Sequence, residues 1–365
     1  MSSPRSVLVV SLRYTGDVLF STALARSIRL AHPETAVDYL VFRGTEGMLA
    51  GNPDVRHVET VEPGGRKAAD LLGRFRKYDV AIGCNASDRT ALQLLLSGRR
   101  TIGFLEERRG DWWKRWGFTH GTVYDKRRHT LEVLLGQLVP LGIPPVPELS
   151  VHYGKEDLAR ARAASGVGPF VLLHPYTRWS YKQWPARHWS ALSLAVEKEL
   201  GIRAMFTIAP GAEEERMREE LVAEGVGEGR FLAEPMPLPV LSALLSLANG
   251  YIGTDTVVTH IAAALGVATV AIFGPTPTVR WGPWPAGHPL PSPYATRGGV
   301  QRAGNVLVVQ KDWECASCDR MGCDHTRESR SRCLDEMGPS EVLSLSRDFL
   351  AGRTGGRAAR AEGAP

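Results

Sequence analysis

Apolar residues along the chain form short continuous runs that alternate with stretches of helical spacing. The first run, residues 7–11, is rich in valine, which is typical of a parallel strand buried on both faces. A loop at 12–17 follows, and 18–30 then carries apolar residues at helical spacing. This pattern predicts one strand-loop-helix unit. The first half repeats it, with strands expected at 37–42, 55–61, 78–82 and 101–104 and helices near 47–50, through Leu96 and at 131–141.

A second series begins after residues 142–147, Gly-Ile-Pro-Pro-Val-Pro, which cannot continue a helix and are typical of a linker. Because strands and helices alternate in both halves, the sequence predicts an α/β fold of two Rossmann-like, doubly wound domains facing across a cleft. The domains are expected at 1–150 and 151–351, the last helix packing back on the first domain, with a disordered tail at 352–365. The strands of the second domain are expected at 170–173, 204–208, 250–253 and 268–273.

Length, composition and charge narrow the class of protein. A chain of 365 residues exceeds what one core usually organises, and 43% hydrophobic with 23% charged residues is ordinary for a globular protein. No apolar run is long enough to span a bilayer and no signal peptide is recognisable, so a cytoplasmic location is expected. The net charge of +5 favours phosphorylated substrates or an anionic membrane surface, but it is too weak to indicate nucleic acid.

The loop after the first predicted strand carries the first candidate site. Residues 13–17 read Arg-Tyr-Thr-Gly-Asp, and Asp17 stands at the start of the next helix. A carboxylate there can act as a general base or can simply cap the helix, and both interpretations stay open. Arg13 and Tyr14 beside it are candidate acceptor contacts. The loop lacks the G-x-G-x-x-G fingerprint, which argues against classical dinucleotide binding.

Two further polar segments follow predicted strands of the second half. Residues 174–185 include Thr177 and Lys182, and hydroxyls and cations in such a loop can hold a diphosphate without a metal, although a solvated loop is the alternative. Residues 253–266 place Asp255 and Thr256 at a helix start, which can bind a phosphate or sugar or can be a well-capped helix. For His260, a candidate donor contact, a satisfied core position is the better interpretation. No Asp-x-Asp metal signature stands at either segment, so no cofactor is expected to be required.

Residues 108–116 combine Arg109 and Lys114 with three tryptophans, and Lys-Arg-Arg follows at 126–128. These cations and aromatics can dock an anionic glycolipid or the membrane surface. The alternative is a basic, solvated face whose tryptophans pack inward.

Four of the five cysteines, Cys315, Cys318, Cys323 and Cys333, are crowded into one segment with the spacing C-x2-C-x4-C-x9-C. They do not form the spread framework of a disulfide-stapled secreted domain. The spacing is compatible with a structural zinc, for which His325 adds a potential ligand. Reduced thiols and a disulfide are the alternatives.

In their order along the chain, residues 12–17, 174–185 and 253–266, followed by Val-Ala-Ile-Phe-Gly-Pro-Thr-Pro at 270–277, resemble the heptosyltransferases of glycosyltransferase family 9. Residues 13–17 and the C-terminal cysteines most resemble the heptosyltransferase III type. The resemblance implies a GT-B fold and inverting transfer of heptose from ADP-heptose to a lipopolysaccharide inner-core glycolipid. It places the reaction at the cytoplasmic face of the inner membrane, where peripheral contact with the membrane is expected.

The resemblance also implies roles for individual residues. Asp17 matches the family's proposed catalytic base, Lys182 its phosphate-binding lysine and Thr177 a hydroxyl on the diphosphate. Asp255 and Thr256 match contacts to the donor sugar and phosphate, and Glu214, or its neighbour Glu213, matches an acidic residue that contacts the nucleoside.

Two departures from the family pattern leave other functions open. The loop between Thr177 and Lys182 is a residue longer than in some relatives, and Val257-Val258 stands where small residues are common. The alternatives are a glycosyltransferase of the same fold with another nucleotide sugar or acceptor, and a nucleotide-sugar epimerase.

Overall fold

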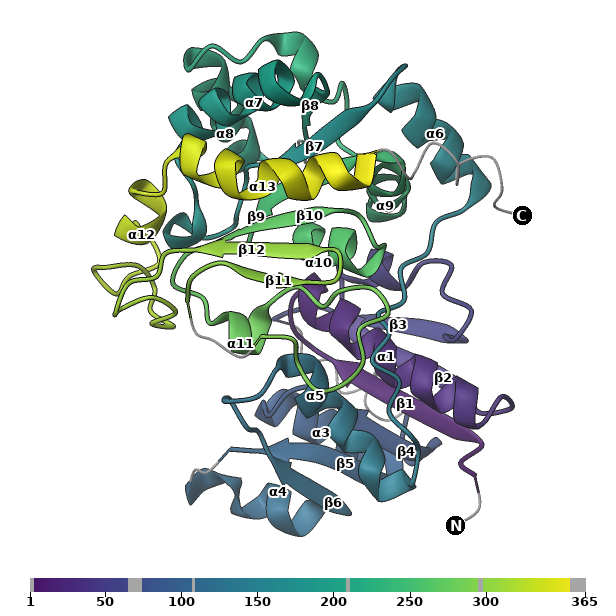
Figure 1. Ribbon diagram of the computed structural model, residues 1–365. Helices are drawn as coiled ribbons and strands as arrows, with labels where there is room; N and C mark the ends of the chain where they lie inside the picture. Colours follow the sequence, from purple (N-terminus) through teal and green to yellow (C-terminus); the bar gives the residue numbers. More distant parts are fainter. Residues whose placement is uncertain (1–2, 65–73, 107–108, 208–210, 295–297, 355–365) are drawn as a thin grey trace. The chain divides into compact units, whose positions relative to one another are not determined.

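The computed structural model describes residues 3–64, 74–106, 109–207, 211–294 and 298–354 (Figure 1). The chain divides into two compact units, one of Met1–His152 with Gly287–Ser292 and one of Tyr153–Ala286 with Pro293–Pro365. Each unit contains a six-stranded sheet, so the predicted α/β fold with two Rossmann-like domains is confirmed. Among the described residues, no helix combines the length and the apolar character needed to cross a membrane.

The sheet of the first unit has the order β3-β2-β1-β4-β5-β6, and all of its strands run parallel. Val7 to Val10 of β1 are fully buried, which explains the continuous valine run. Because the strand order reverses between β1 and β4, the loops that follow these strands diverge and leave a binding position at their carboxyl ends. The strands are β1 (Ser6–Ser11), β2 (Ala36–Phe42), β3 (His57–Val61), β4 (Tyr78–Gly83), β5 (Gly98–Leu105) and β6 (His120–Val123).

Two predicted helices of the first unit differ from their predicted bounds, and the helix Trp112–Gly117 was not predicted. Helix α1 begins at Thr15 rather than at residue 18, because the Asp17 carboxylate accepts a hydrogen bond from the Tyr14 backbone N–H at 3.3 Å and closes the first turn. The helix predicted at 131–141 is α-helical only to Leu135 and continues as a 3-10 helix that contains Pro140. The helices are α1 (Thr15–Ala31), η1 (Glu46–Leu49), α3 (Asp88–Ser97), η2 (Arg109–Asp111), α4 (Trp112–Gly117), α5 (Thr130–Leu135) and η3 (Gly136–Leu141).

The sheet of the second unit has the order β11-β12-β10-β9-β7-β8, and it is parallel except for β11, which pairs antiparallel with β12. The strand order reverses between β7 and β9, so the loops after these two strands bound the equivalent binding position. The strands are β7 (Phe170–His174), β8 (Arg203–Phe206), β9 (Gly250–Thr254), β10 (Thr269–Phe273), β11 (Gln301–Ala303) and β12 (Val306–Gln310).

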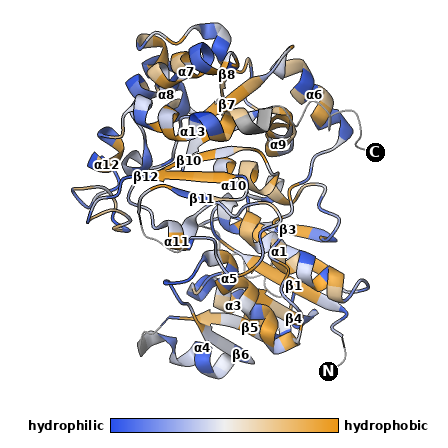
Figure 2. Ribbon diagram, in the orientation of Figure 1, coloured by the Kyte–Doolittle hydropathy of each residue, from blue (hydrophilic) through white to orange (hydrophobic). Residues whose placement is uncertain are grey.

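The core of the second unit lies between its largely apolar sheet and the helices around it (Figure 2). Trp184 and Trp189 are fully buried and pack edge to face, with 5.0 Å between the centres of their rings. The last helix, α13 (Pro339–Thr354), packs on α7 (Ala186–Leu200) and on β12. This helix includes residues 352–354, which were predicted to belong to a disordered tail, and residues 355–365 lie outside the described part of the chain.

The remaining helices of the second unit are α6 (Lys155–Ser165), η4 (Ser180–Lys182), α8 (Ala212–Ala223), η5 (Glu228–Arg230), α9 (Leu238–Leu247), α10 (Val257–Ala264), α11 (Thr278–Trp281) and α12 (Arg332–Asp335).

Candidate functional site

In the second unit, the loops after β7 and β9 meet through an ion pair. Lys182, in the 3-10 turn η4, donates a hydrogen bond to Asp255, the first residue after β9, with 2.5 Å between Nζ and Oδ2. The side chain of Lys182 is 21% exposed and that of Asp255 is 8% exposed. The structure thus brings together two predicted site residues that stand 73 positions apart in the sequence.

The ion pair keeps both of its members charged. Burial lowers the pKa of Lys182, but the charge of Asp255 and the hydrogen bond to it outweigh burial and hold that pKa above its usual value. Burial raises the pKa of Asp255, but the charge of Lys182, the nearby His260 and the hydrogen bonds from Lys182 and Thr276 together outweigh burial, so the pKa of this carboxyl is lowered. A partly exposed ammonium that is charged at neutral pH therefore stands at the carboxyl end of the sheet.

Two histidines near this ion pair are neutral. His260 is 5% exposed, and its Nε2 lies 4.0 Å from Asp255 Oδ1. His174 ends β7, and its Nδ1 lies 2.6 Å from Thr207 Oγ1. Burial lowers the pKa of each histidine to about 4. At neutral pH they add hydrogen-bonding groups without charge.

The other predicted donor contacts lie on the same loops or close to them. Thr177 is buried, and its hydroxyl donates to the Trp179 carbonyl at 2.8 Å, so it also shapes the loop. Thr256 is the N-terminal cap residue of α10. Glu214 lies in the first turn of α8, close to Tyr176: burial raises the pKa of Tyr176, and the negative charge of Glu214 raises it further.

A contact that the sequence did not predict supports the Lys182 loop from the C-terminal segment. Ser331 Oγ donates to the Tyr181 carbonyl at 2.6 Å, and the Arg327 guanidinium lies 4.7 Å from the centre of the Trp179 ring. Such contacts join residues about 150 positions apart and leave no pattern in the sequence.

The clustered cysteines belong to this supporting segment. Burial, and then the nearby thiols of Cys323, Cys318 and Cys315, raise the pKa of the Cys333 thiol to about 12. Within the described residues, however, no three His, Cys, Asp or Glu side chains form a group that could hold a metal ion. The side chains as placed do not fit the zinc hypothesis, which stays a prediction from spacing until metal analysis of protein purified without an affinity metal tests it.

In the first unit, Asp17 lies at the position where the strand order reverses. Asp17 is not the N-cap residue of α1, because that position is Tyr14; the half-buried Asp17 carboxylate stands three residues further on and accepts from the Tyr14 N–H. Cys84 follows β4, and its pKa is raised to about 12 by burial and then by the charge of Asp17. Asp17 is therefore near the ends of both β1 and β4. Arg13 and Tyr14 beside it are exposed.

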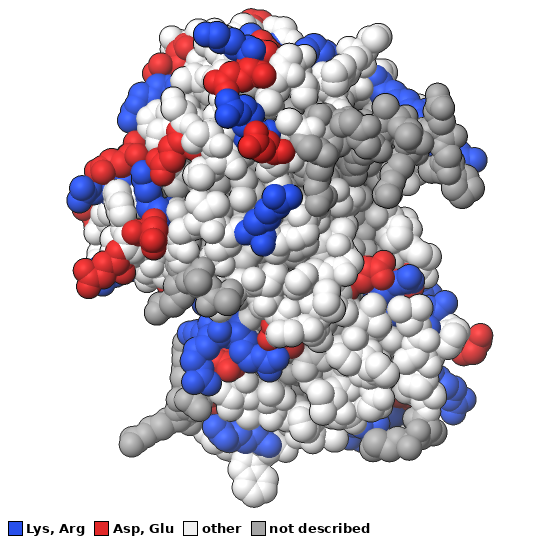
Figure 3. All heavy atoms as spheres, in the orientation of Figure 1, with Lys and Arg blue, Asp and Glu red and all other residues white. Residues whose placement is uncertain are grey.

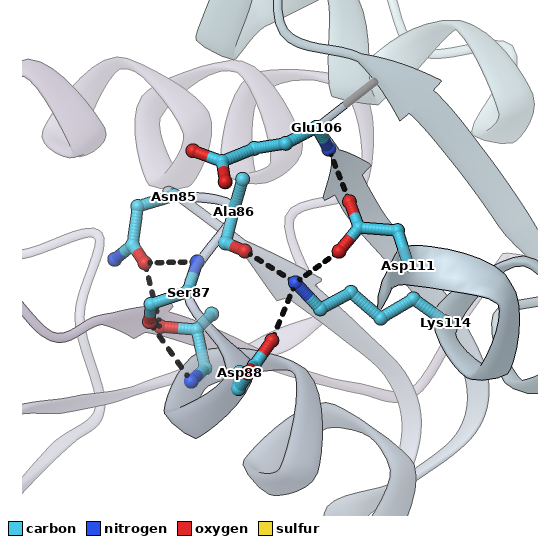
Figure 4. Close-up of polar contacts among 8 residues, drawn as sticks. Asn85, Ala86, Ser87, Asp88, Glu106, Asp111 and Lys114 are labelled. Carbon is cyan, nitrogen blue, oxygen red and sulfur yellow. Dashed lines mark hydrogen bonds and ion pairs between the residues drawn. The ribbon is translucent and has the colours of Figure 1, made fainter. Parts of the chain in front are cut away.

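Lys114 does not lie where the prediction needs it. It is 2% exposed; its Nζ donates to the Ala86 carbonyl at 2.8 Å and pairs with Asp88 at 2.7 Å and Asp111 at 3.0 Å (Figure 4). Because this ammonium is enclosed by these partners, the prediction that Lys114 contacts an acceptor is wrong. The side chain of Arg109 and the whole of Arg108 lie outside the described part of the chain.

Comparisons with known proteins identify the family. The sequence model of glycosyltransferase family 9 (heptosyltransferase) matches residues 71–288. Lipopolysaccharide heptosyltransferase 3 of Escherichia coli is 27% identical over 293 residues, which cover 75% of this chain and 84% of that protein.

Solved structures share the fold. A glycosyl transferase family 9 protein from Veillonella parvula DSM 2008 has a TM-score of 0.76 at 20% identity and covers 95% of this chain and 98% of its own. The E. coli ADP-heptose lps heptosyltransferase II has a TM-score of 0.72 at 19% identity and covers 95% of this chain and 99% of its own.

Proposed function

This chain belongs to glycosyltransferase family 9, the heptosyltransferases, and on that basis we propose that it transfers heptose from ADP-heptose to a lipopolysaccharide inner-core acceptor. The acceptor class follows from the heptosyltransferase 3 relative, and the donor from the ADP-heptose named for heptosyltransferase II. The observation that carries the proposal is the Lys182–Asp255 ion pair, which presents a cation where two polar loops meet. The family match favours transfer over epimerisation.

The second unit binds the donor in this proposal. Lys182 binds the diphosphate and neutralises the charge that develops as the nucleotide leaves, which makes a metal unnecessary. Asp255 holds the ammonium in place and is a positioning residue for it. The amides at the start of α10, beside Thr256, add donors for phosphate or sugar, and Glu214 contacts the nucleoside.

The first unit supplies the base. As the acceptor oxygen attacks the anomeric carbon, its proton passes to the Asp17 carboxylate. The bond from the anomeric carbon to the β-phosphate oxygen breaks, and ADP departs with that electron pair beside Lys182. A single displacement inverts the anomeric centre. Arg13, Tyr14 and Arg109 are the proposed acceptor contacts.

Two substitutions test this division of labour. Asp17→Asn keeps an acceptor for the Tyr14 N–H, so we expect an intact helix start, ADP affinity within a factor of about two, and transfer reduced roughly 10²- to 10⁴-fold.

Lys182→Ala removes a charged hydrogen-bond donor worth about 1.5–3 kcal/mol, which weakens ADP binding about 10- to 150-fold. Calorimetry with ADP and an ADP-release assay with a heptose-deficient lipopolysaccharide acceptor measure the two effects.

The controls separate loss of the cation from damage to the fold. Lys182→Ala leaves Asp255 buried without its partner, so the double variant Lys182→Ala, Asp255→Asn is compared with it. Lys155→Ala, at an exposed lysine that begins α6, should bind ADP like the unchanged protein. Unchanged ADP affinity in both Lys182 variants, or full transfer by Asp17→Asn, contradicts the assignment. Turnover of the sugar nucleotide without acceptor points to an epimerase instead.

A further inference from the structure

Helix α4 presents two large aromatic side chains outward. Trp112 is 66% exposed and Trp116 is 87% exposed, and the exposed Arg115 stands between them in the sequence. Positions 112, 115 and 116 are related by three and four residues, so they share one side of the helix. We call these three residues the α4 face. Trp113, by contrast, packs against the apolar core of the first unit.

The burial of Lys114 fixes this orientation. Its ammonium binds the Ala86 carbonyl and Asp88, which link it to the start of α3, and it binds Asp111 just before α4 (Figure 4). The other oxygen of Asp111 accepts from the Glu106 N–H at 2.5 Å, directly after β5. A helix of six residues is unstable alone, so these bonds hold it. The fold therefore turns the α4 face toward solvent.

The C-terminal end of α4 is also held tightly. Phe118 is buried in the same core, and a Cβ added at Gly117 would lie 2.9 Å from a methyl carbon of Leu95. The helix cannot roll to bury its tryptophans without displacing these residues. Two exposed indoles on a fixed helix indicate a binding surface.

The charge of the surrounding unit indicates the partner. Residues 1–152 contain 21 Lys and Arg against 16 Asp and Glu, so the whole formal excess of +5 lies in them. The loop after β6 carries three exposed cations, Lys126, Arg127 and Arg128. This loop lies beside the end of β5, where the Tyr124 N–H donates to the Leu105 carbonyl at 3.1 Å.

This basic loop and the start of α4 both follow carboxyl ends of neighbouring strands, β6 and β5. Arg127 pairs with Asp125 and Arg128 with Glu132, which reduces but does not reverse the local charge. Figure 3 shows Lys and Arg atoms gathered over the part of the first unit that carries α4 and β6.

We propose that the α4 face and the basic loop 126–128 dock on an anionic lipid bilayer, an inference that rests on the proposed function because the acceptor is a glycolipid. Tryptophan side chains favour the region of the lipid headgroups, where the ring and the N–H both find suitable surroundings. Cations near an anionic membrane each contribute about 1 kcal/mol. The row Trp112, Arg115 and Trp116 combines both contributions on one fixed surface.

Vesicle sedimentation with the full chain tests the proposal. We expect binding to phosphatidylcholine vesicles that contain phosphatidylglycerol, weak binding to phosphatidylcholine alone, and loss of binding at high salt. Trp112→Ala with Trp116→Ala should weaken binding about tenfold or more, and Arg115→Glu roughly 30-fold. Phe75→Ala is the matched control: Phe75 is 63% exposed but stands before the start of β4, at the opposite ends of the strands, and its loss should change nothing.

The readouts distinguish this proposal from the proposed function, because sedimentation needs neither donor nor acceptor. Transfer to a short, soluble acceptor should be unchanged in the tryptophan variants, whatever the activity of the unchanged protein. Equal binding of the unchanged protein and the tryptophan variants overturns the proposal. So does equal binding to charged and uncharged vesicles, or binding only to vesicles that contain lipopolysaccharide, which would identify the glycolipid itself as the partner.

Discussion

At the scale of single residues, burial decides the charge of His174 and gives the stability of the protein a pH dependence. The folded protein holds the pKa of this histidine at about 4, whereas an unfolded chain has the ordinary value of about 6.5. Between these values the unfolded state binds a proton that the folded state does not. The contribution of His174 to the free energy of unfolding should therefore have its full value above pH 6.5. It should fall as the pH drops toward 4, by at most about 1.4 kcal/mol per pH unit.

Urea unfolding between pH 7 and pH 5 measures this slope before most carboxylates titrate. His174→Asn, which keeps a polar group near Thr207, should show a shallower slope than the unchanged protein, while His260 still contributes in both. An equal slope in His174→Asn would show that this histidine is not the source.

The residue types of the site could be predicted, but their partners could not. Polar residues after β1, β7 and β9 stand out because they follow continuous apolar runs, and this placed Asp17, Lys182 and Asp255 at strand ends. Nothing local shows that Lys182 and Asp255 form an ion pair. Lys114 was misjudged for the same reason: a lysine beside tryptophans looks exposed until Asp88 and Asp111 enclose it.

At the scale of elements, Lys114 holds α4 in place, and its removal should destabilise the first unit. Lys114→Met leaves the Asp111 carboxylate, 5% exposed, without its cation. Removing one partner of a buried ion pair costs about 3–5 kcal/mol, and we expect the lower end because Asp88 remains largely exposed to water. Denaturant unfolding measures this loss of unfolding free energy.

The control is Arg115→Met, one residue further along the same helix but exposed, which should change the free energy of unfolding by less than about 0.5 kcal/mol. Similar losses in both variants would show that the Lys114 contacts do not stabilise the fold.

Strands were predicted well where they are buried on both faces and less well at the sheet edges. Strands β1, β2 and β7 lie within one residue of their predicted bounds because their apolar runs are continuous. The pattern missed β6 and β11, which are edge strands of four and three residues without a buried run. Strand β12 was not among the predicted strands, although its run Val-Leu-Val-Val is fully typical of a buried strand, so the sequence does contain a signal for it.

At the scale of the whole molecule, the chain does not pass once from one unit to the next. Residues Gly287–Ser292 return to the first unit, where the Ser292 backbone N–H donates to the Glu132 carboxylate. The segment 142–147, predicted as a linker, lies within the first unit, and the first passage comes after His152. This short segment contacts the first unit through residues that stand 160 positions apart in the sequence. Neither hydrophobic periodicity nor turn residues can predict such a contact.

The identity of the donor base is likewise a property of the assembled loops rather than of the fold, and thermal unfolding can reveal it. A ligand that binds only the folded state at 100 times its Kd stabilises that state by about 2.7 kcal/mol. For units of this size such stabilisation raises the unfolding temperature by roughly 5–10 °C.

We expect ADP to give the largest shift of the unfolding temperature, with UDP and GDP at the same concentration giving smaller ones. Asp17→Asn should respond to ADP like the unchanged protein and Lys182→Ala should show a smaller shift, because of these two residues only Lys182 contacts the diphosphate in the proposed mechanism. Equal shifts with all three nucleotides would mean that the diphosphate alone is recognised, and a larger shift with UDP or GDP would point to a different nucleotide sugar.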